Sequence, residues 1–261
     1  MAADDLRSST GDVKPRTALV MIPERDAYPL ASVQRGLTAL GIAVVPDHAA
    51  DLLVTWSPWL GSPRRAAQAN FEASSRPVIV LENGWLSPLS GMPFYQIARN
   101  GWNGRGAFLA GTGERWASWR MTLAPWRRDG PHTALVVGQW GHLFDKRSHL
   151  PGWHREVDLP PNWLAIRRDK GESGPIEAAL AEVSRVVVWT SGVASWAVLA
   201  GVPVHYCGPN LMVAALAAPG LDLDQPVTPE REPELERLAW AQWNAAEIAT
   251  GEPFARALAL P

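Results

Sequence analysis

The chain has 261 residues, a formal net charge of −2 and a single cysteine, Cys207. This length suits one large domain or two domains of about 100 to 200 residues each. A single cysteine excludes an intramolecular disulfide and a cysteine-rich zinc site. The charges are uneven, because residues 1–130 carry 14 Lys and Arg against 11 Asp and Glu, whereas residues 131–261 carry 10 against 15. If a polyanion binds, the first half is therefore the expected face.

No apolar run typical of a secretory signal opens the chain, and we expect residues 1–15 to form a disordered lead-in. The apolar stretch from Val186 to Ala218 is interrupted by Ser, Gly, Pro and His, which argues against a membrane span there. We therefore expect a cytoplasmic protein with no membrane span.

Apolar runs and amphipathic segments alternate through the first half, which is typical of α/β proteins. The expected strands are Thr17–Ile22, Ile42–Val45, Asp51–Trp56 and Pro77–Leu81, and the expected helices are about 30–40, 63–73 and 114–123. Residues 82–113 are polar and rich in glycine, and no regular element is expected in them. The segment PWRRDGPH then marks a boundary near residues 125–131.

The second half restarts the pattern with strands at Thr133–Val137 and Trp163–Arg167 and a helix at about 175–183. Residues 185–208 then form a strand, a small-residue turn, an Ala-rich helix and a second strand. Beyond a connector we expect one helix over about 233–250, which crosses back to the first domain. The predicted fold class is α/β, with two Rossmann-like domains facing a cleft. The predicted boundaries are 1–15 for the lead-in, 16–128 and 129–228 for the two domains, and 229–261 for the returning helix.

Several polar segments follow predicted strands, where parallel sheets bind ligands and helix N-termini favour phosphate. The turn after the strand at 185–189 is a candidate phosphate site, although its small residues would equally serve close packing. The segment after the strand at 77–81 is a candidate ligand wall, and the segment after the strand at 133–137 would serve as a plain turn or as a ligand site. An Arg- and Gly-rich loop at 99–106 offers planar forks and a stacking ring, with an ordinary tight loop as the alternative. In chain order these candidates are Glu82, Asn83 and Trp85; Arg99, Asn100, Trp102, Asn103 and Arg105; Gly138 and Gln139; Arg167 and Arg168; and Thr190, Ser191, Gly192 and Ser195.

Other chemistries lack their motifs. The chain contains no H-E-x-x-H, no G-x-x-x-x-G-K-[ST] and no G-x-S-x-G, which disfavours a metalloprotease, a P-loop NTPase and an α/β-hydrolase. Asp222-Leu223-Asp224 matches the D-x-D metal motif of one glycosyltransferase class, but its setting, PGLDLDQPVTP, predicts a linker. We expect no metal site.

The two α/β units, with SGVASWAVLAGVPVHYCG in the second, resemble GT-B glycosyltransferases, whose donor half ends in a similar turn, helix and G-x-P-V. The segments ENGWL, RNGWNGRGAF, VVGQW and LAWAQWNAAEIATGEPF resemble bacteriophage-encoded glycosyltransferases, and the resemblance covers about residues 77–250. Capsule-type members often carry R-x-H-P where this chain has Ile166-Arg167-Arg168-Asp169, so it departs from them at the His and the Pro.

The resemblance implies that the second domain binds a nucleotide-sugar donor, with UDP as the commonest nucleotide and without an obligatory metal. Thr190, Ser191, Gly192 and Ser195 would lie at the diphosphate, Arg167 or Arg168 would neutralise charge, and Gly138, Gln139 and His205 would lie near the nucleotide or sugar. Glu24 and Asp26, just after the first strand, are the expected general bases, with Glu82 behind them.

A phage-type resemblance implies a hydroxymethylated pyrimidine in double-stranded DNA as the acceptor, and hence the host cytoplasm as the location. Basic residues of the first half would follow the phosphates. These are Arg64, Arg65, Arg99, Arg105, Arg120, Arg127 and Arg128. Three alternatives stay open: a capsule- or lipopolysaccharide-type transferase, a non-catalytic module that binds sugar nucleotides or DNA, and a sugar-nucleotide epimerase.

Overall fold

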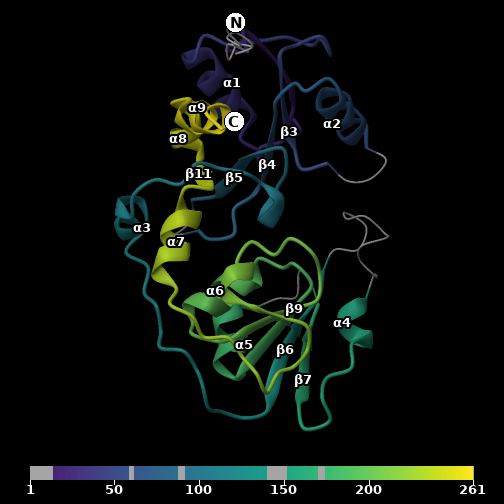
Figure 1. Ribbon diagram of the computed structural model, residues 1–261, viewed down its shortest axis with the longest axis vertical. Coiled ribbons are helices and arrows are strands. Elements are labelled where there is room, and N and C mark those ends of the chain that lie inside the picture. Colours follow the sequence, from purple (N-terminus) through teal and green to yellow (C-terminus); the bar gives the residue numbers. More distant parts are fainter. Residues whose placement is uncertain (1–13, 59–61, 88–91, 140–151, 170–173, 261) are drawn as a thin grey trace, which may run out of the picture.

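The computed structural model describes residues 14–58, 62–87, 92–139, 152–169 and 174–260, and within them the strands form two sheets (Figure 1). The first sheet has the order β11-β5-β4-β3-β1-β2. Its strands are β1 (Thr17–Met21), β2 (Ala43–Val44), β3 (Leu52–Trp56), β4 (Val78–Asn83), β5 (Phe94–Arg99) and β11 (Gln242–Asn244). Strands β1 to β4 are parallel, and β5 runs antiparallel to both β4 and β11.

Helices cover both faces of this sheet (Figure 1). One face packs on α1 (Leu30–Ala39), α8 (Ala245–Ala249) and α9 (Glu252–Leu258), and the other packs on α2 (Pro63–Ala73). Helix α2 begins as its sequence predicts, because Ser62 Oγ accepts a hydrogen bond from the Arg65 amide at 3.2 Å and Pro63 opens the first turn.

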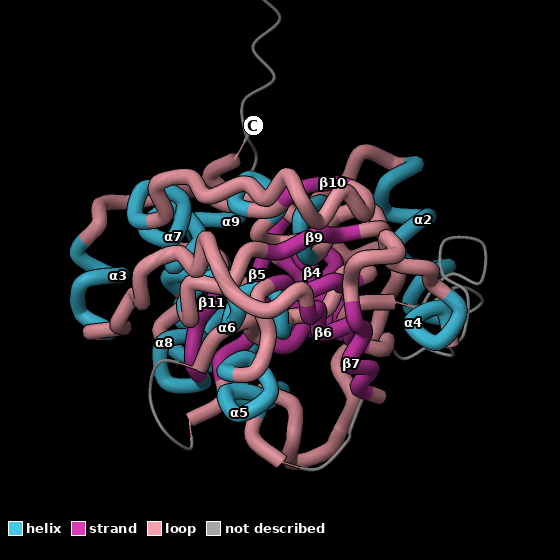
Figure 2. Tube along the Cα trace, turned by 90° about the horizontal axis from the view of Figure 1, so that it is seen from below, coloured by secondary structure: helices cyan, strands magenta, loops and turns pink. Residues whose placement is uncertain are grey.

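The second sheet is wholly parallel and has the order β10-β9-β8-β6-β7. Its strands are β6 (Thr133–Val137), β7 (Leu164–Arg168), β8 (Arg185–Val188), β9 (Val204–Tyr206) and β10 (Ala218–Pro219). Helices α5 (Ile176–Ala181) and α6 (Val193–Leu199) lie on one face, and the short α4 (Trp153–Glu156) lies on the other (Figure 2). The two sheets and their helices bear out the predicted α/β class.

Three strands were not expected from the sequence, and one of them is the short β10 at the edge of the second sheet. Strand β5 lies within residues 82–113, where no regular element was predicted. The single helix expected over about 233–250 is instead α7 (Glu232–Ala239), β11 and α8. The helix is interrupted because Gln242–Asn244 pair with Phe94–Gln96, and the Ile97 amide donates to the Ala241 carbonyl at 2.9 Å. Tertiary pairing thus overrides the helical pattern of this segment.

The remaining helices join the two sheets. These are α3 (Glu114–Trp119), the 3₁₀ turn η1 (Asn103–Arg105) and the 3₁₀ turn η2 (Ala214–Leu216). One apolar core includes Trp85 and Leu86, which follow β4, together with Leu211 and Met212, which follow β9. The segments beyond the carboxyl ends of β4 and β9 therefore border the same core. None of the helices that the structure describes is long and apolar enough to cross a membrane.

The side chain of Arg115 in α3 clamps the returning C-terminal segment. Its guanidinium forms two hydrogen bonds with the Glu247 carboxylate, at 2.7 and 3.0 Å, and donates to the carbonyls of Ala239 and Gln242, both at 2.8 Å. It also lies 4.1 Å from the centre of the Trp243 ring. Only 10% of the Arg115 side chain is exposed, so these contacts are largely shielded from water.

Replacing Arg115 with Met should lower the free energy of unfolding by about 2 to 4 kcal/mol, because a partly buried carboxylate and two carbonyls lose their donor. Denaturant titration followed by tryptophan fluorescence measures this change. Arg237→Met is the matched control, since Arg237 pairs with Glu234 on the surface of α7 and should contribute less than about 1 kcal/mol. Equal losses in the two variants would contradict the clamp.

Candidate functional site

A hydrogen-bonded carboxylate lies at the carboxyl edge of the first sheet. Glu82, near the end of β4, accepts a hydrogen bond from the Ser57 hydroxyl, which follows β3. Its Oε1 also accepts from the amide and the side-chain nitrogen of Asn83, at 2.7 and 2.9 Å. Burial lowers the pKa of the nearby Arg64 guanidinium, while Tyr28 and Glu82 act in the opposite direction. Ser57, Arg64 and Tyr28 therefore join the predicted Glu82 and Asn83 here.

Glu24 and Asp26 lie at the same edge of the sheet. Both are exposed in the turn that follows β1, which neighbours β3. Their carboxylates are open to solvent, whereas that of Glu82 is held by hydrogen bonds. The structure thus brings the three predicted carboxylates to one edge, two of them exposed to solvent and the third held by hydrogen bonds.

Gly138, Gln139 and Thr190 lie together at the carboxyl edge of the second sheet. The Gly138 amide donates to the Arg168 carbonyl at 2.8 Å, and Gln139 Nε2 donates to Thr190 Oγ1 at 3.2 Å. Gly192 follows in the same turn as Thr190 and is exposed, and a Cβ added to it would meet no atom within 4 Å. This turn is therefore open to a ligand.

Three predicted donor residues are buried. Ser191 is 3% exposed, and its Oγ accepts from the Val193 amide at 3.3 Å. Ser195 lies within α6 at 1% exposure. His205 is fully buried in β9, and burial, aided by the positive charge of Arg185, lowers its pKa to about 4. The ring of His205 is thus a neutral part of the core.

Arg167 and Arg168 hold neighbouring backbone segments. Arg167 donates to the carbonyl of His154 and, at 3.0 Å, to that of Val157, so it braces α4. Arg168 donates to the carbonyl of Gly174 at 2.6 Å. In this structure both guanidinium groups are engaged with protein carbonyls rather than presented to the turn at Thr190.

A histidine–aspartate pair that was not predicted from the sequence lies beside Gly138. His154 Nε2 lies 2.6 Å from Oδ1 of Asp169, and the other carboxylate oxygen accepts from Arg155 at 2.6 Å. Asp169 directly follows β7, so the pair stands at the same edge of the sheet as Gly138 and Gln139. The two residues are 15 positions apart in the chain, and no motif spacing connects them.

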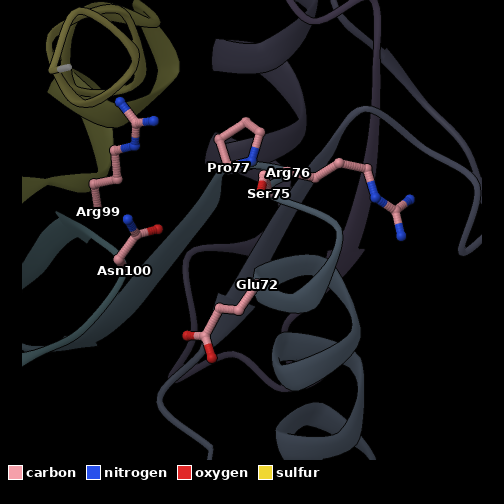
Figure 3. A pocket seen from close by; sticks show the side chains of 6 residues that line it. All are labelled: Glu72, Ser75, Arg76, Pro77, Arg99 and Asn100. Carbon is pink, nitrogen blue, oxygen red and sulfur yellow. The ribbon is translucent and has the colours of Figure 1, made fainter.

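The predicted Arg- and Gly-rich loop is divided between two places. Since β5 is antiparallel to β4, Arg99 and Asn100 lie at the amino edge of the first sheet, where the Asn100 amide donates to the Val78 carbonyl at 2.8 Å. They line a hollow of about 260 Å³ together with Arg76 (Figure 3). Figure 3 shows the two guanidinium groups pointing away from each other, and Arg99 donates to the carbonyl of Leu260.

In the rest of this loop, Gly104 and Arg105 contact the second unit, whereas Asn103 and Trp102 contact the first. Arg105 Nε donates to Asn210 Oδ1 at 3.0 Å, and the Gly104 amide donates to the Asn210 carbonyl at 2.9 Å. Asn103 forms two backbone hydrogen bonds with the Gln96 side chain, at 2.8 and 3.2 Å. Trp102 is partly buried beside the core under α2. These residues connect the two units through contacts of their own.

Trp85 and the D-x-D segment at residues 222–224 take part in packing and hydrogen bonding within the protein. Trp85 is 6% exposed and belongs to the core that both sheets share, so little of its ring is open to a ligand. Asp224 accepts a hydrogen bond from Trp163 Nε1 at 2.9 Å, and the intervening Leu223 is fully buried. Among the residues described, no group of three His, Cys, Asp or Glu could hold a metal ion.

Two solved structures are similar to this fold. KpsC of Thermosulfurimonas dismutans, titled a beta Kdo 2,7 transferase, is 14% identical with a TM-score of 0.54, over 93% of this chain and 99% of that chain. A second structure of KpsC from the same organism, titled a beta Kdo 2,4 transferase, is also 14% identical, with a TM-score of 0.51. The match covers 90% of this chain and 97% of that chain. No family model and no curated protein matches. At 14% identity, this likeness shows that the chain shares an α/β fold with two proteins that are titled transferases.

Acid should destabilise the fold through His205. Its folded pKa of about 4 lies below the ordinary 6.5, so the unfolded chain binds the proton first and stability falls as the pH drops from 6.5 to 4. The loss amounts to about 3 kcal/mol. His205→Leu should remove most of this loss in unfolding curves taken between pH 7 and 4, and His48→Gln, at an exposed position, should not. An unchanged profile for His205→Leu would contradict this assignment.

Filling the open turn should block a phosphate there. Gly192 has a φ of −60°, which any residue adopts, so Gly192→Leu should fold normally and extend into free space. We expect at least a tenfold loss of affinity for UDP, or for whichever nucleoside phosphate the unaltered protein binds best, in isothermal titration calorimetry. Ala73→Leu, exposed on α2, is the control. Equal affinity in Gly192→Leu would place the ligand elsewhere.

Proposed function

We propose that this chain is a glycosyltransferase of the GT-B type that moves a sugar from a nucleotide-sugar donor to a hydroxyl of a saccharide. The observation that carries the proposal is the fold, which the chain shares over 93% of its length with a beta Kdo 2,7 transferase. The polar residues at the carboxyl ends of both sheets support it, because α/β proteins bind ligands at that edge. The predicted two-domain division remains part of this proposal.

The donor is assigned to the second sheet. Gln139 and Thr190 offer hydrogen-bonding side chains beside the open backbone at Gly192. Backbone amides and polar side chains are the groups that bind phosphate in such turns without a metal. UDP is the first nucleotide to test because it is the commonest donor carrier.

The acceptor is assigned to the carboxylate edge of the first sheet. Transfer with inversion needs a general base that takes the proton of the acceptor hydroxyl. The exposed Glu24 and Asp26 are free to approach a ligand, while Glu82 is already oriented by Ser57 and Asn83. We assign the base to this set of three.

A saccharide acceptor has more support than DNA. The two structural neighbours are titled Kdo transferases, and neither comes from a bacteriophage. Arg99, Arg105 and Arg127, which were expected to follow a DNA backbone, instead donate to Leu260, Asn210 and Leu180 within the chain. A capsule- or lipopolysaccharide-type acceptor is therefore the one we propose.

Mass spectrometry tests the proposal directly. The protein is incubated with a panel of nucleotide sugars, one of which carries Kdo, and with either short bacterial-surface saccharides or hydroxymethylated DNA. A mass gain on a saccharide supports the proposal. A gain on DNA nucleosides alone would restore the DNA acceptor, and nucleotide-sugar binding without transfer to either would indicate a non-catalytic module.

Removing the general base should slow the reaction without affecting donor binding. Among Glu24→Gln, Asp26→Asn and Glu82→Gln, at least one should lower kcat about 100-fold or more, because the amide cannot accept the hydroxyl proton. Steady-state kinetics and calorimetry separate the two effects. Glu72→Gln, at the other end of the sheet, is the matched control. Normal turnover in all three variants would place the base outside this edge.

A further inference from the structure

His154 is held rigidly by three separate contacts. Its Nε2 meets the Asp169 carboxylate at 2.6 Å, and its backbone carbonyl accepts from Arg167. The ring lies so close to Gly138 that a Cβ there would stand 3.0 to 3.1 Å from three ring atoms. Only glycine at position 138 accommodates the imidazole without a shift, which accounts for the glycine directly after β6.

The second ring nitrogen has no hydrogen-bond partner among the residues that the structure describes. The His154 side chain is 6% exposed, and its Nδ1 is buried with no hydrogen bond. Buried polar atoms in folded proteins are nearly always paired, so an unpaired nitrogen on a side chain this rigid indicates a missing partner. The atom lies against Gly138, which directly follows β6, at the edge of the sheet to which the donor is assigned.

The surroundings favour an anionic partner. Arg155 and Arg167 contact the pair, and Asp169 is the carboxylate that faces them. Hydrogen bonds from Arg155 and His154 lower the pKa of Asp169, so its carboxylate stays ionised and accepts the Nε2–H. With Nε2–H held by this carboxylate, a ring that takes up a second proton together with a phosphate ligand presents Nδ1–H as a charged donor, and such donors form strong hydrogen bonds with phosphate oxygens.

We propose that His154 is a further donor-binding residue, whose Nδ1–H hydrogen-bonds a phosphate oxygen of the nucleotide sugar, with Asp169 as its positioning residue. This inference rests on the proposed function, because it needs a nucleotide at the second sheet. It assigns recognition of the leaving phosphate to α4, in addition to the turn at Thr190.

Calorimetry with nucleotides tests the assignment. The probes are the common nucleoside mono- and diphosphates, and the parent nucleoside of the one that binds best. His154→Phe keeps a ring over Gly138 but removes the donor, and it should weaken nucleoside phosphate binding about 10- to 100-fold, leaving nucleoside binding and the melting temperature unchanged. His154→Asn, whose amide can replace Nδ1–H, should restore part of the affinity. His132→Asn, at the amino edge of the same sheet, is the matched control and should behave as the unaltered protein.

A spectroscopic measurement on the unaltered protein covers the case in which a variant does not fold. In long-range ¹H–¹⁵N spectra of the imidazoles, the best-binding nucleotide should shift the His154 Nδ1 signal, and the His132 signals should stay in place. Two results would overturn the role of His154 and leave the proposed function standing. One is nucleotide binding to the unaltered protein without that shift, and the other is nucleotide binding with full affinity to a folded His154→Phe variant. If the unaltered protein binds no nucleoside phosphate, the donor site fails, and this inference fails with it.

Discussion

The buried side chain of Gln242 joins the end of the chain to the segment that leaves β4. Its Oε1 accepts from the amides of Trp85 and Leu86, both at 3.1 Å, and its Nε2 donates to the Leu86 carbonyl at 2.8 Å. Residues more than 150 positions apart are thereby fixed to each other. Because these amides and the carbonyl are buried, losing the glutamine would leave them unpaired.

This contact determines where the carboxylate edge lies. Only Gly84 separates Trp85 and Leu86 from Glu82 and Asn83, so the end of β4 is placed by Gln242. The same two residues enter the core of the second sheet. Arg115 secures the other side of β11 through Glu247, which also caps α8. The position of the carboxyl edge of the first sheet relative to that of the second thus depends on polar contacts made by a short returning strand.

Local sequence predicted the elements whose stability is local. Ser62 and Pro63 mark the start of α2, and the apolar run at 133–137 forms β6 with the predicted bounds. Strand β5 could not be predicted, because FYQIAR carries the polar Gln96, which is buried against Met212, a residue 116 positions away in the chain. Strand β11 was hidden within a helical pattern, although Asn244 and Glu247 formed a visible capping box for α8.

The same contrast between local sequence signals and tertiary contacts applies to the candidate site. Glu82, Gly138, Gln139 and Thr190 reached ligand-binding edges because each follows or ends a parallel strand, which sequence pattern can identify. Arg99 reached the opposite edge because the unseen antiparallel strand reversed the chain direction. His154 could not be found from spacing, since only the packing of α4 brings it to Asp169.

The measurement that tests the central claim most directly is a crystal structure of the protein with its best-binding nucleotide. The account predicts the phosphate at the carboxyl edge of the second sheet, within hydrogen-bonding distance of the Thr190–Gly192 turn and opposite the carboxylates of the first sheet. A nucleotide bound instead at the amino edge, in the hollow beside Arg99 and Asn100, would contradict it.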